Sequence, residues 1–240
     1  PSRHSENRAH RHLMLSQGRF SAVVAAIGFW LSTFAAASAE SLPKGFVFLA
    51  DIDATIRQDI RYAGSDNFTH SPVPGYRAAE CVLAEATARA LARVQQDLRR
   101  RGYSLLVFDC YRPAKAVRRF VEWARAVGTP DAAYHPHVRR NRLIAEGYIA
   151  ARSGHSSGGT VDLTLVRDAA GGFKPLDMGT NFDFFDPAAA TGSKKIPAEA
   201  RVNRLLLVDA MAAAGFANYR REWWHFRDRN EPFAGRIFDF

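Results

Sequence analysis

The chain has 240 residues, of which 47% are hydrophobic, and this is enough to bury a core without a disulfide framework. The formal net charge is +9, of which residues 1–39 contribute +3 through four Arg and one Glu. The remaining basic residues are scattered among acidic ones, without a basic stripe or an identifiable reading module, which argues against a nucleic-acid partner.

Residues 1–39 have the pattern of an export signal. Arginines precede an apolar run of 17 residues from Ser21 to Ala37, and the small residues Ala37 and Ala39 stand just before Glu40. This order is typical of a signal peptide that is cut after residue 39. An uncleaved membrane anchor is the alternative, although the run is at the short edge for a span. We therefore expect an exported, periplasmic protein with no stable membrane anchor after the signal is removed.

Beyond the signal, strand and helix patterns follow one another in an irregular order. The patterns predict strands at residues 45–50 and 56–62, a helix at 81–101, a strand at 103–110, a helix at 113–127, a short helix at 142–149, a strand at 160–165, a helix at 198–214 and a strand-like segment at 216–226. We find no internal repeat and no second domain. Residues 40–240 are therefore expected to form one α+β domain, with a mostly antiparallel central sheet flanked by helices.

The predicted strand at residues 160–165 has the clearest alternation. Val161, Leu163 and Leu165 face one way, and the polar residues between them face the other. Asp162 consequently projects from the face that is not part of the core. We expect a cleft on this face of the sheet, where Asp162 can meet a ligand.

Cys81 and Cys110 are the only cysteines of the chain. An oxidising compartment permits them to pair, and the bridge would close a loop of about 30 residues, worth roughly 3–4 kcal/mol in the chain-entropy model. Two buried free thiols are the alternative. Neither cysteine is accompanied by the usual partners of a nucleophile, so we assign no catalytic role to them.

Two short segments contain the residues with the most specific chemistry. The first reads S-x-H-x6-D, from Ser153 through His155 to Asp162, and the second reads E-x-x-H, from Glu222 to His225. Alone, the histidine would be an ordinary loop residue and the aspartate an ordinary surface acid. Together, two imidazoles and one carboxylate are the ligand set of a catalytic zinc site that keeps a fourth position open. We expect one zinc ion per chain.

Glu222 and Arg112 are the candidates for the catalytic side chains. A carboxylate three residues from His225 can take a proton from the attacking water and deliver it to the leaving amine; the alternative is that it only orients the imidazole. Arg112 follows a buried strand and precedes Pro113, a rigid place from which to stabilise a developing negative charge. Judged by its place in the sequence alone, Arg112 is at least as well explained by a surface salt bridge to Asp109.

The chain resembles the D-alanyl-D-alanine dipeptidase family of the VanX type, which belongs to the zinc D-Ala-D-Ala peptidases that share a fold with the amino-terminal domain of hedgehog proteins. The resemblance covers roughly residues 45–230. It is carried by Tyr111-Arg112-Pro113, Ser153-x-His155-x6-Asp162, Glu222-Trp-Trp-His225-Phe226 and Met178-Gly179-x-x-Phe182-Asp183-Phe184.

This resemblance implies hydrolysis of the dipeptide D-Ala-D-Ala to free D-alanine. It implies the metal ligands given above, the acid/base role of Glu222 and a transition-state role of Arg112. It also places Asp183 where the family holds the free ammonium of the dipeptide, and Ser153 in the wall of the pocket. Because the signal indicates export, recovery of D-alanine from wall turnover is favoured over antibiotic resistance.

Two other functions remain as alternatives. One is a D,D-carboxypeptidase that trims the same bond from peptidoglycan stem peptides, for which an open groove would be expected. The other is a non-catalytic, zinc-binding module of the hedgehog kind. The intact Glu222 argues against the second, because a purely structural site has no use for a positioned base.

Overall fold

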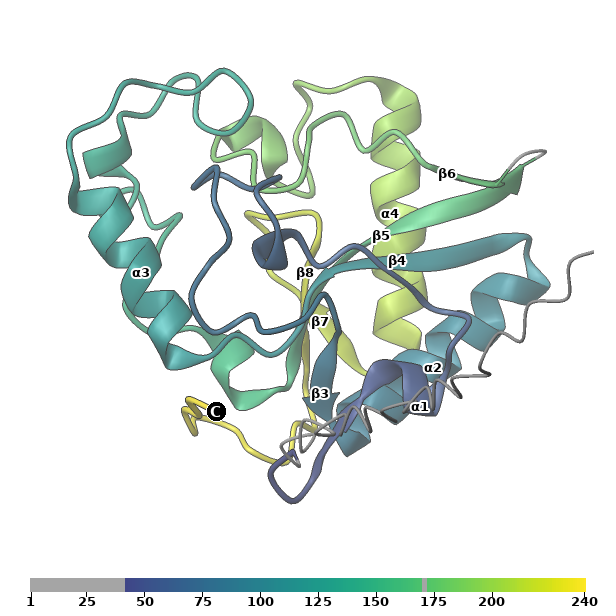
Figure 1. Cartoon of the computed structure of the whole chain (residues 1–240). Coiled ribbons are helices and arrows are strands. Elements are labelled where there is room, and N and C mark those ends of the chain that lie inside the picture. The colour runs from purple at the N-terminus through teal and green to yellow at the C-terminus, as the bar shows by residue number, and fades with distance from the viewer. Residues whose placement is uncertain (1–41, 170–171) are drawn as a thin grey trace, which may run out of the picture. The chain divides into compact units, whose positions relative to one another are not determined.

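A mixed six-stranded sheet lies at the centre of the fold (Figure 1). The computed structural model describes residues 42–169 and 172–240, so the predicted signal at residues 1–39 lies outside the described residues. The strand order is β2-β4-β5-β8-β7, and β6 pairs with the second half of β5. The strands span Arg57–Gln58 (β2), Tyr103–Asp109 (β4), Thr160–Ala169 (β5), Gly172–Pro175 (β6), Phe216–Asn218 (β7) and His225–Asp228 (β8).

The sheet differs from the expected, mostly antiparallel one because β2 runs parallel to β4, while the other pairs of this sheet are antiparallel. A parallel partner requires a long crossover connection. Residues 59–102 provide it, and they include β3 (Val82–Ala84) and α2 (Glu85–Arg100). The two-residue strand β2 is too short to show an alternation, so the sequence does not predict this pairing. The α+β class is confirmed.

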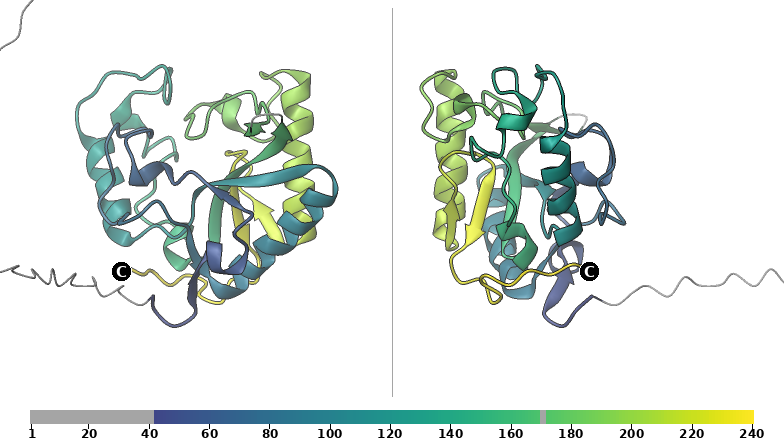
Figure 2. Two further views of the ribbon diagram at one scale, coloured as in Figure 1. Left: turned by 45° about the vertical axis from the view of Figure 1, so that its right-hand side comes forward. Right: turned by 90° about the vertical axis from the view of Figure 1, so that its left-hand side faces the viewer.

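The two faces of the sheet have different coverings. Helices α2 and α4 (Ala198–Ala213) pack on one face, against β4, β5 and β7. Leu163 and Leu165 of β5 are fully buried there, as their alternation predicts. Helix α3 (Ala114–Arg125) lies on the opposite side, which Figure 2 shows edge-on. Asp162 therefore points to the α3 side, away from the α2–α4 layer.

A second, two-stranded sheet joins β1 (Phe46–Phe48) to β3 in antiparallel fashion. The strand predicted at residues 45–50 is shorter than expected because the chain turns into the short helix α1 (Leu49–Ile52). The helix predicted at residues 81–101 begins only at Glu85, since the three residues before it pair with β1. Helical spacing alone does not reveal a partner strand that is so far away in sequence.

Three other predictions fail in detail, and one is the strand predicted at residues 56–62, of which only the two residues of β2 are a strand. The short helix predicted at residues 142–149 is wrong, because this stretch forms turns after the 3₁₀ turn η2 (Arg140–Arg142). The strand-like segment predicted at residues 216–226 is two strands, β7 and β8, connected by a turn. The other 3₁₀ turns are η1 (Arg61–Ala63), η3 (Gly154–Ser157) and η4 (Pro187–Ala189).

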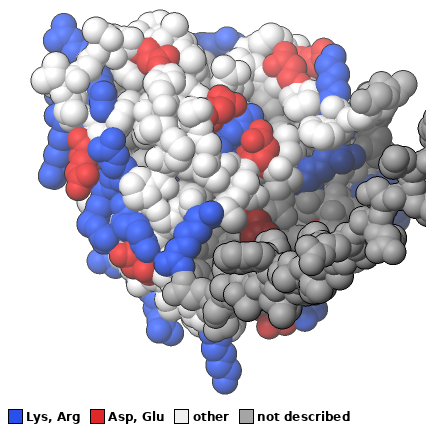
Figure 3. All heavy atoms as spheres, in the orientation of Figure 1, with Lys and Arg blue, Asp and Glu red and all other residues white. Residues whose placement is uncertain are grey.

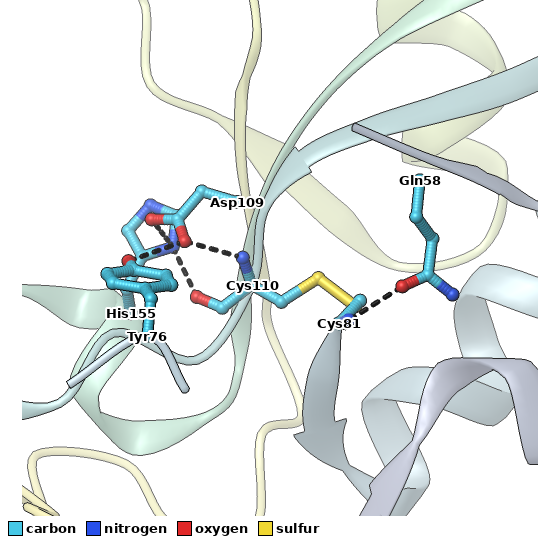
Figure 4. The surroundings of a disulfide bond; sticks show 6 residues. All are labelled: Gln58, Tyr76, Cys81, Asp109, Cys110 and His155. Carbon is cyan, nitrogen blue, oxygen red and sulfur yellow. Dashed lines mark hydrogen bonds and ion pairs between the residues drawn. A yellow bond between two sulfur atoms is a disulfide. The ribbon is translucent and has the colours of Figure 1, made fainter. Parts of the chain in front are cut away.

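Cys81 and Cys110 form a disulfide bond, with their Cα atoms 5.3 Å apart (Figure 4). The structure therefore has the bridged cysteines and not two free thiols, and both cysteines are buried. The bond connects the end of β4 to the start of β3, and so it links the two sheets.

The surface carries many basic side chains. On the face shown in Figure 3, Lys and Arg gather mostly on the side of α3, with acidic side chains among them. Arg118 of α3, for example, pairs with Asp239. No helix in residues 42–169 and 172–240 combines the length and the apolar character that a membrane crossing requires.

Candidate metal centre and active site

Three neighbouring strands bring the predicted site residues together. Asp162 of β5 lies opposite Asp109 of β4 on one side and opposite His225 of β8 on the other. Directly opposed residues on antiparallel strands have Cβ atoms about 4.5–5.5 Å apart. The sheet register therefore places two acids and one imidazole in a row, although Asp109 and His225 are more than a hundred residues apart in sequence.

His155 reaches this row from the 3₁₀ turn η3, which precedes β5. The hydroxyl oxygen of Ser153 accepts a hydrogen bond from the backbone N–H of His155 at 3.2 Å and thereby caps the turn. Gly158 ends the turn in the left-handed conformation, at φ 77°, which glycine adopts without a Cβ clash. These two local signals direct the chain from the His155 loop into the strand that carries Asp162.

The orientation of the His155 ring is fixed by its surroundings. Its Nδ1 lies 2.7 Å from the carbonyl oxygen of Cys110. Because a carbonyl oxygen can only accept, Nδ1 carries the proton and Nε2 keeps its lone pair free. Nε2 in turn lies 3.3 Å from Oδ1 of Asp162 and 3.3 Å from Nδ1 of His225. A hydrogen-bonded Nδ1 with a free Nε2 is the usual state of a metal-binding histidine.

His155, Asp162 and His225 form a group of side chains that fits a metal ion. One ligand atom from each lies within 4.8 Å of the others. Oδ1 of Asp162 is buried and has no hydrogen-bond partner among the described residues, although it lies 3.0 Å from Nδ1 of His225. Buried carboxylate oxygens are normally satisfied. A cation among these three atoms would satisfy this one, and two imidazoles with one carboxylate suit zinc.

Glu222 lies beside this group, in the turn between β7 and β8. Its Oε2 is 3.6 Å from Nδ1 of His225, and the carboxylate is not among the three converging ligands. Burial raises the pKa of Glu222 to about 7; His225 opposes this rise, and Asp162 adds to it. A carboxyl group with this pKa can both accept and return a proton near neutral pH, which is the property required of a general acid/base.

Arg112 lies in the same site, and its partner is indeed Asp109. Nε and Nη2 of Arg112 lie 2.9 and 2.8 Å from Oδ2 of Asp109. The pair is not a surface salt bridge, because the Asp109 side chain is fully buried. Nη2 also lies 3.6 Å from Oδ2 of Asp162, so the guanidinium borders the candidate metal centre. Asp109 thus holds the cation of Arg112 in a fixed place.

Asp183 forms another part of the wall of the pocket that contains Glu222 and Arg112. Its Oδ2 accepts a hydrogen bond of 2.8 Å from the hydroxyl of Tyr62, and its backbone has the left-handed φ of 58°. A non-glycine residue in this conformation costs of order 1–3 kcal/mol and is concentrated at functional sites. Burial raises the pKa of Asp183 well above its ordinary value, and the charge of Asp162 adds to this rise. The carboxylate form therefore needs a positive partner in this pocket.

The pocket that these residues share has a volume of about 300 Å³. Besides the groups above, its wall includes Ser153, Arg152 and residues 147–150. Of the seven site residues predicted from the sequence, six line this pocket, and His155 contacts two of them, Asp162 and His225; the six are Arg112, Ser153, Asp162, Asp183, Glu222 and His225.

Three polar residues of the site are missing from the sequence-based assignment. Asp109 appears there only as a possible surface partner of Arg112, although its position at the end of a buried strand was a usable signal. Tyr62 and Tyr76 bond the carboxylates of Asp183 and Asp109, at 2.8 and 2.7 Å respectively. Nothing in the sequence near the two tyrosines indicates these partners, because each contact joins distant segments.

The comparisons with known proteins agree with one another. A model of the D-Ala-D-Ala dipeptidase family matches residues 43–240. The chain is 40% identical over 197 residues to a D-alanyl-D-alanine dipeptidase of Streptomyces coelicolor, covering 81% of this chain and 96% of that protein. It is 38% identical over 201 residues to a protein of the same name from Enterococcus faecalis, covering 83% and 98% of the two chains.

A more distant relative in Escherichia coli K12, again named D-alanyl-D-alanine dipeptidase, is 33% identical over 180 residues and covers 75% of this chain and 82% of its own. The match to the family model spans nearly all of the described residues, including the whole candidate site. The chain therefore belongs to the D-Ala-D-Ala dipeptidase family of peptidases.

Proposed function

We propose that the protein hydrolyses the dipeptide D-Ala-D-Ala to two molecules of D-alanine, with one zinc ion held by His155, Asp162 and His225. The observation that supports this most is the content of one small pocket. Three side chains that fit a metal ion, a largely buried carboxyl group with a pKa of about 7 and a second buried carboxylate lie in or directly beside the wall of a pocket of about 300 Å³.

The chain contributes two groups to the chemical step. Zinc, when bound, polarises the scissile carbonyl and lowers the pKa of a water molecule. Glu222 accepts a proton from the attacking water and then gives it to the nitrogen of the leaving D-alanine. Arg112 supplies a fixed positive charge for the oxygen that becomes negative, because its ion pair with Asp109 holds it at the edge of the metal site.

Asp183 accounts for the restriction to a free dipeptide. Its carboxylate, held by the Tyr62 hydroxyl, is buried and lies in the wall of the same pocket as Glu222. An ammonium group is the cation that a free dipeptide offers to such a carboxylate. An N-acylated peptide has no charge at this position, so the buried carboxyl group of Asp183 would lose its cationic partner and would stay ionised only at a large cost.

The proposed function is tested by removing and restoring the metal. The purified protein is dialysed against a chelator, and D-alanine released from D-Ala-D-Ala is measured before and after zinc is added back. We expect activity to disappear with the metal and to return at one zinc per chain, and His155→Ala to lose both metal and activity. Full activity in metal-free protein, or full zinc occupancy in the His155→Ala variant, would contradict the proposal.

A further inference from the structure

The disulfide bond lies directly behind the candidate metal centre. Cys110 is the first residue after β4, and Cys81 is the residue before β3. Both side chains are buried, at 2% and 1% exposure. Figure 4 shows the bond beside Asp109 and His155, two residues of the site. The proposed mechanism uses neither cysteine.

Cys110 is in contact with the site through its backbone. Its carbonyl oxygen accepts the hydrogen bond from Nδ1 of His155, at 2.7 Å, and its N–H donates to Oδ1 of Asp109, at 2.9 Å. Oδ2 of Asp109 in turn holds Arg112. The orientation of one metal-binding imidazole and of the Arg112 guanidinium therefore depends on where the backbone of Cys110 lies.

The regular sheet does not secure this backbone by itself. The pairing of β4 with β5 shifts its register between Val107 and Asp109, so the ladder is irregular just before Cys110. Cys110 itself lies one residue beyond the end of β4, and its carbonyl bonds the His155 side chain instead of a neighbouring strand. A ladder hydrogen bond of β4 therefore does not define the position of that carbonyl.

The other end of the disulfide is well anchored. The N–H of Cys81 donates to Oε1 of Gln58, at 2.6 Å, and its carbonyl oxygen accepts from the N–H of Leu49, at 2.9 Å. The three residues after Cys81 form β3, paired with β1. The N–H of Tyr111 adds one hydrogen bond to Val82, at 2.9 Å. The disulfide thus joins the irregular end of β4 to an ordered element.

We propose that the Cys81–Cys110 disulfide is a positioning element of the metal centre, and not only a stabilising link of the fold. By fixing the Cys110 peptide, it holds Nδ1 of His155 in its hydrogen bond and keeps Nε2 directed at Asp162 and His225. The proposal rests on the proposed zinc site. It concerns the affinity of the apoprotein for the metal, so its test does not depend on turnover.

The test compares zinc affinities under native conditions. The Cys81→Ala/Cys110→Ala double variant and the wild-type protein are stripped of metal, and their zinc affinity is measured by competition with a chromogenic chelator. Loss of a residue that orients a metal ligand typically weakens metal binding about 10- to 100-fold. We expect a loss in this range for the folded double variant, with its circular dichroism spectrum unchanged.

A matched variant separates positioning from general destabilisation. Leu98→Ala removes a fully buried side chain from α2, on the face of the sheet that is remote from the site. It should lower the unfolding temperature and leave zinc affinity within about twofold of wild type, because a substitution at a distant position acts independently of the metal site. If the double variant does not fold, Cys81→Ser alone cuts the covalent link with a smaller change and is measured in the same way.

The outcomes are distinguishable. Wild-type zinc affinity in a folded variant without the disulfide would overturn this inference and leave the proposed function intact. An equal loss of affinity in Leu98→Ala would also overturn it, because the effect would then follow from stability. A wild-type protein that binds no zinc would overturn the proposed function itself.

Discussion

At the scale of single residues, the site uses the same chemical group for different purposes in different surroundings. Asp162 lies between two imidazoles, which hold its pKa below the ordinary value even though burial alone would raise it. Glu222 is largely buried but lacks such a pair of partners, and its pKa rises to about 7. A carboxylate that stays ionised suits a metal ligand, and one that exchanges its proton near neutral pH suits an acid/base.

This contrast leads to a prediction for Glu222→Gln. The amide has almost the same shape but cannot accept the proton of the water, so kcat should fall about 10²- to 10⁴-fold while zinc stays bound. Steady-state release of D-alanine and metal analysis of the same sample measure the two quantities. Glu199→Gln, on the exposed side of α4, is the matched control and should behave as wild type. More than about a tenth of wild-type activity in Glu222→Gln would leave Glu222 with only an orienting role.

At the scale of elements, local patterns predict those parts of the site that are short in sequence. The segment from His155 to Asp162 contains a turn and the start of a strand. The two glycines, Gly158 and Gly159, indicate the turn, and the alternation that follows them predicts the strand. The pairing of β5 with β4 and β8 joins residues that are 53 to 67 positions apart in sequence, and no local pattern encodes it. For the same reason Asp109 is not recognised as a member of the site, and β3 is taken for the first turn of a helix.

The turn that connects His155 to β5 gives a prediction about stability. In Gly158→Ala, the new Cβ would collide with the Phe46 ring and lie 3.0 Å from the backbone nitrogen of Ala84, at a φ of +77°. Gly102 has a similar φ of +76° but open space around it, so Gly102→Ala isolates the cost of the conformation, about 1–2 kcal/mol.

Overpacking should add about 1–3 kcal/mol in Gly158→Ala. Urea unfolding of both variants measures the difference in the free energy of unfolding. Because the collision would displace the turn that carries His155, zinc affinity should fall only in Gly158→Ala. Equal destabilisation of the two variants would show that the close approach to Phe46 does not matter.

At the scale of the whole molecule, the two faces of the sheet have different compositions. The face under α2 and α4 is apolar, and the face toward α3 carries the polar groups of the site beside buried aromatic residues such as Phe120 and Trp123. The apolar side follows from the alternation of β5, and it is predictable from the sequence. The mixed character of the sheet is not, since it depends on a two-residue strand and a long crossover.

We further propose that the protein is exported and that residues 1–39 are removed on the way. The presence of a disulfide supports an oxidising compartment, where such bonds persist. Mass spectrometry of the protein secreted by an expressing cell should show a chain that begins at Glu40 and carries no alkylatable thiol. A mature form that retains residues 21–39 would contradict cleavage.

The central claim is that the protein is a zinc dipeptidase restricted to a free amino terminus. The most direct measurement is the kcat/KM of the zinc-loaded wild-type protein for D-Ala-D-Ala and for N-acetyl-D-Ala-D-Ala. Leaving Asp183 without its cationic partner costs about 2–5 kcal/mol, on the order of 30- to several-thousand-fold in kcat/KM. We predict a preference for the free dipeptide of at least this size. Release of D-alanine from both substrates at similar rates would contradict the account and assign the protein to the D,D-carboxypeptidases.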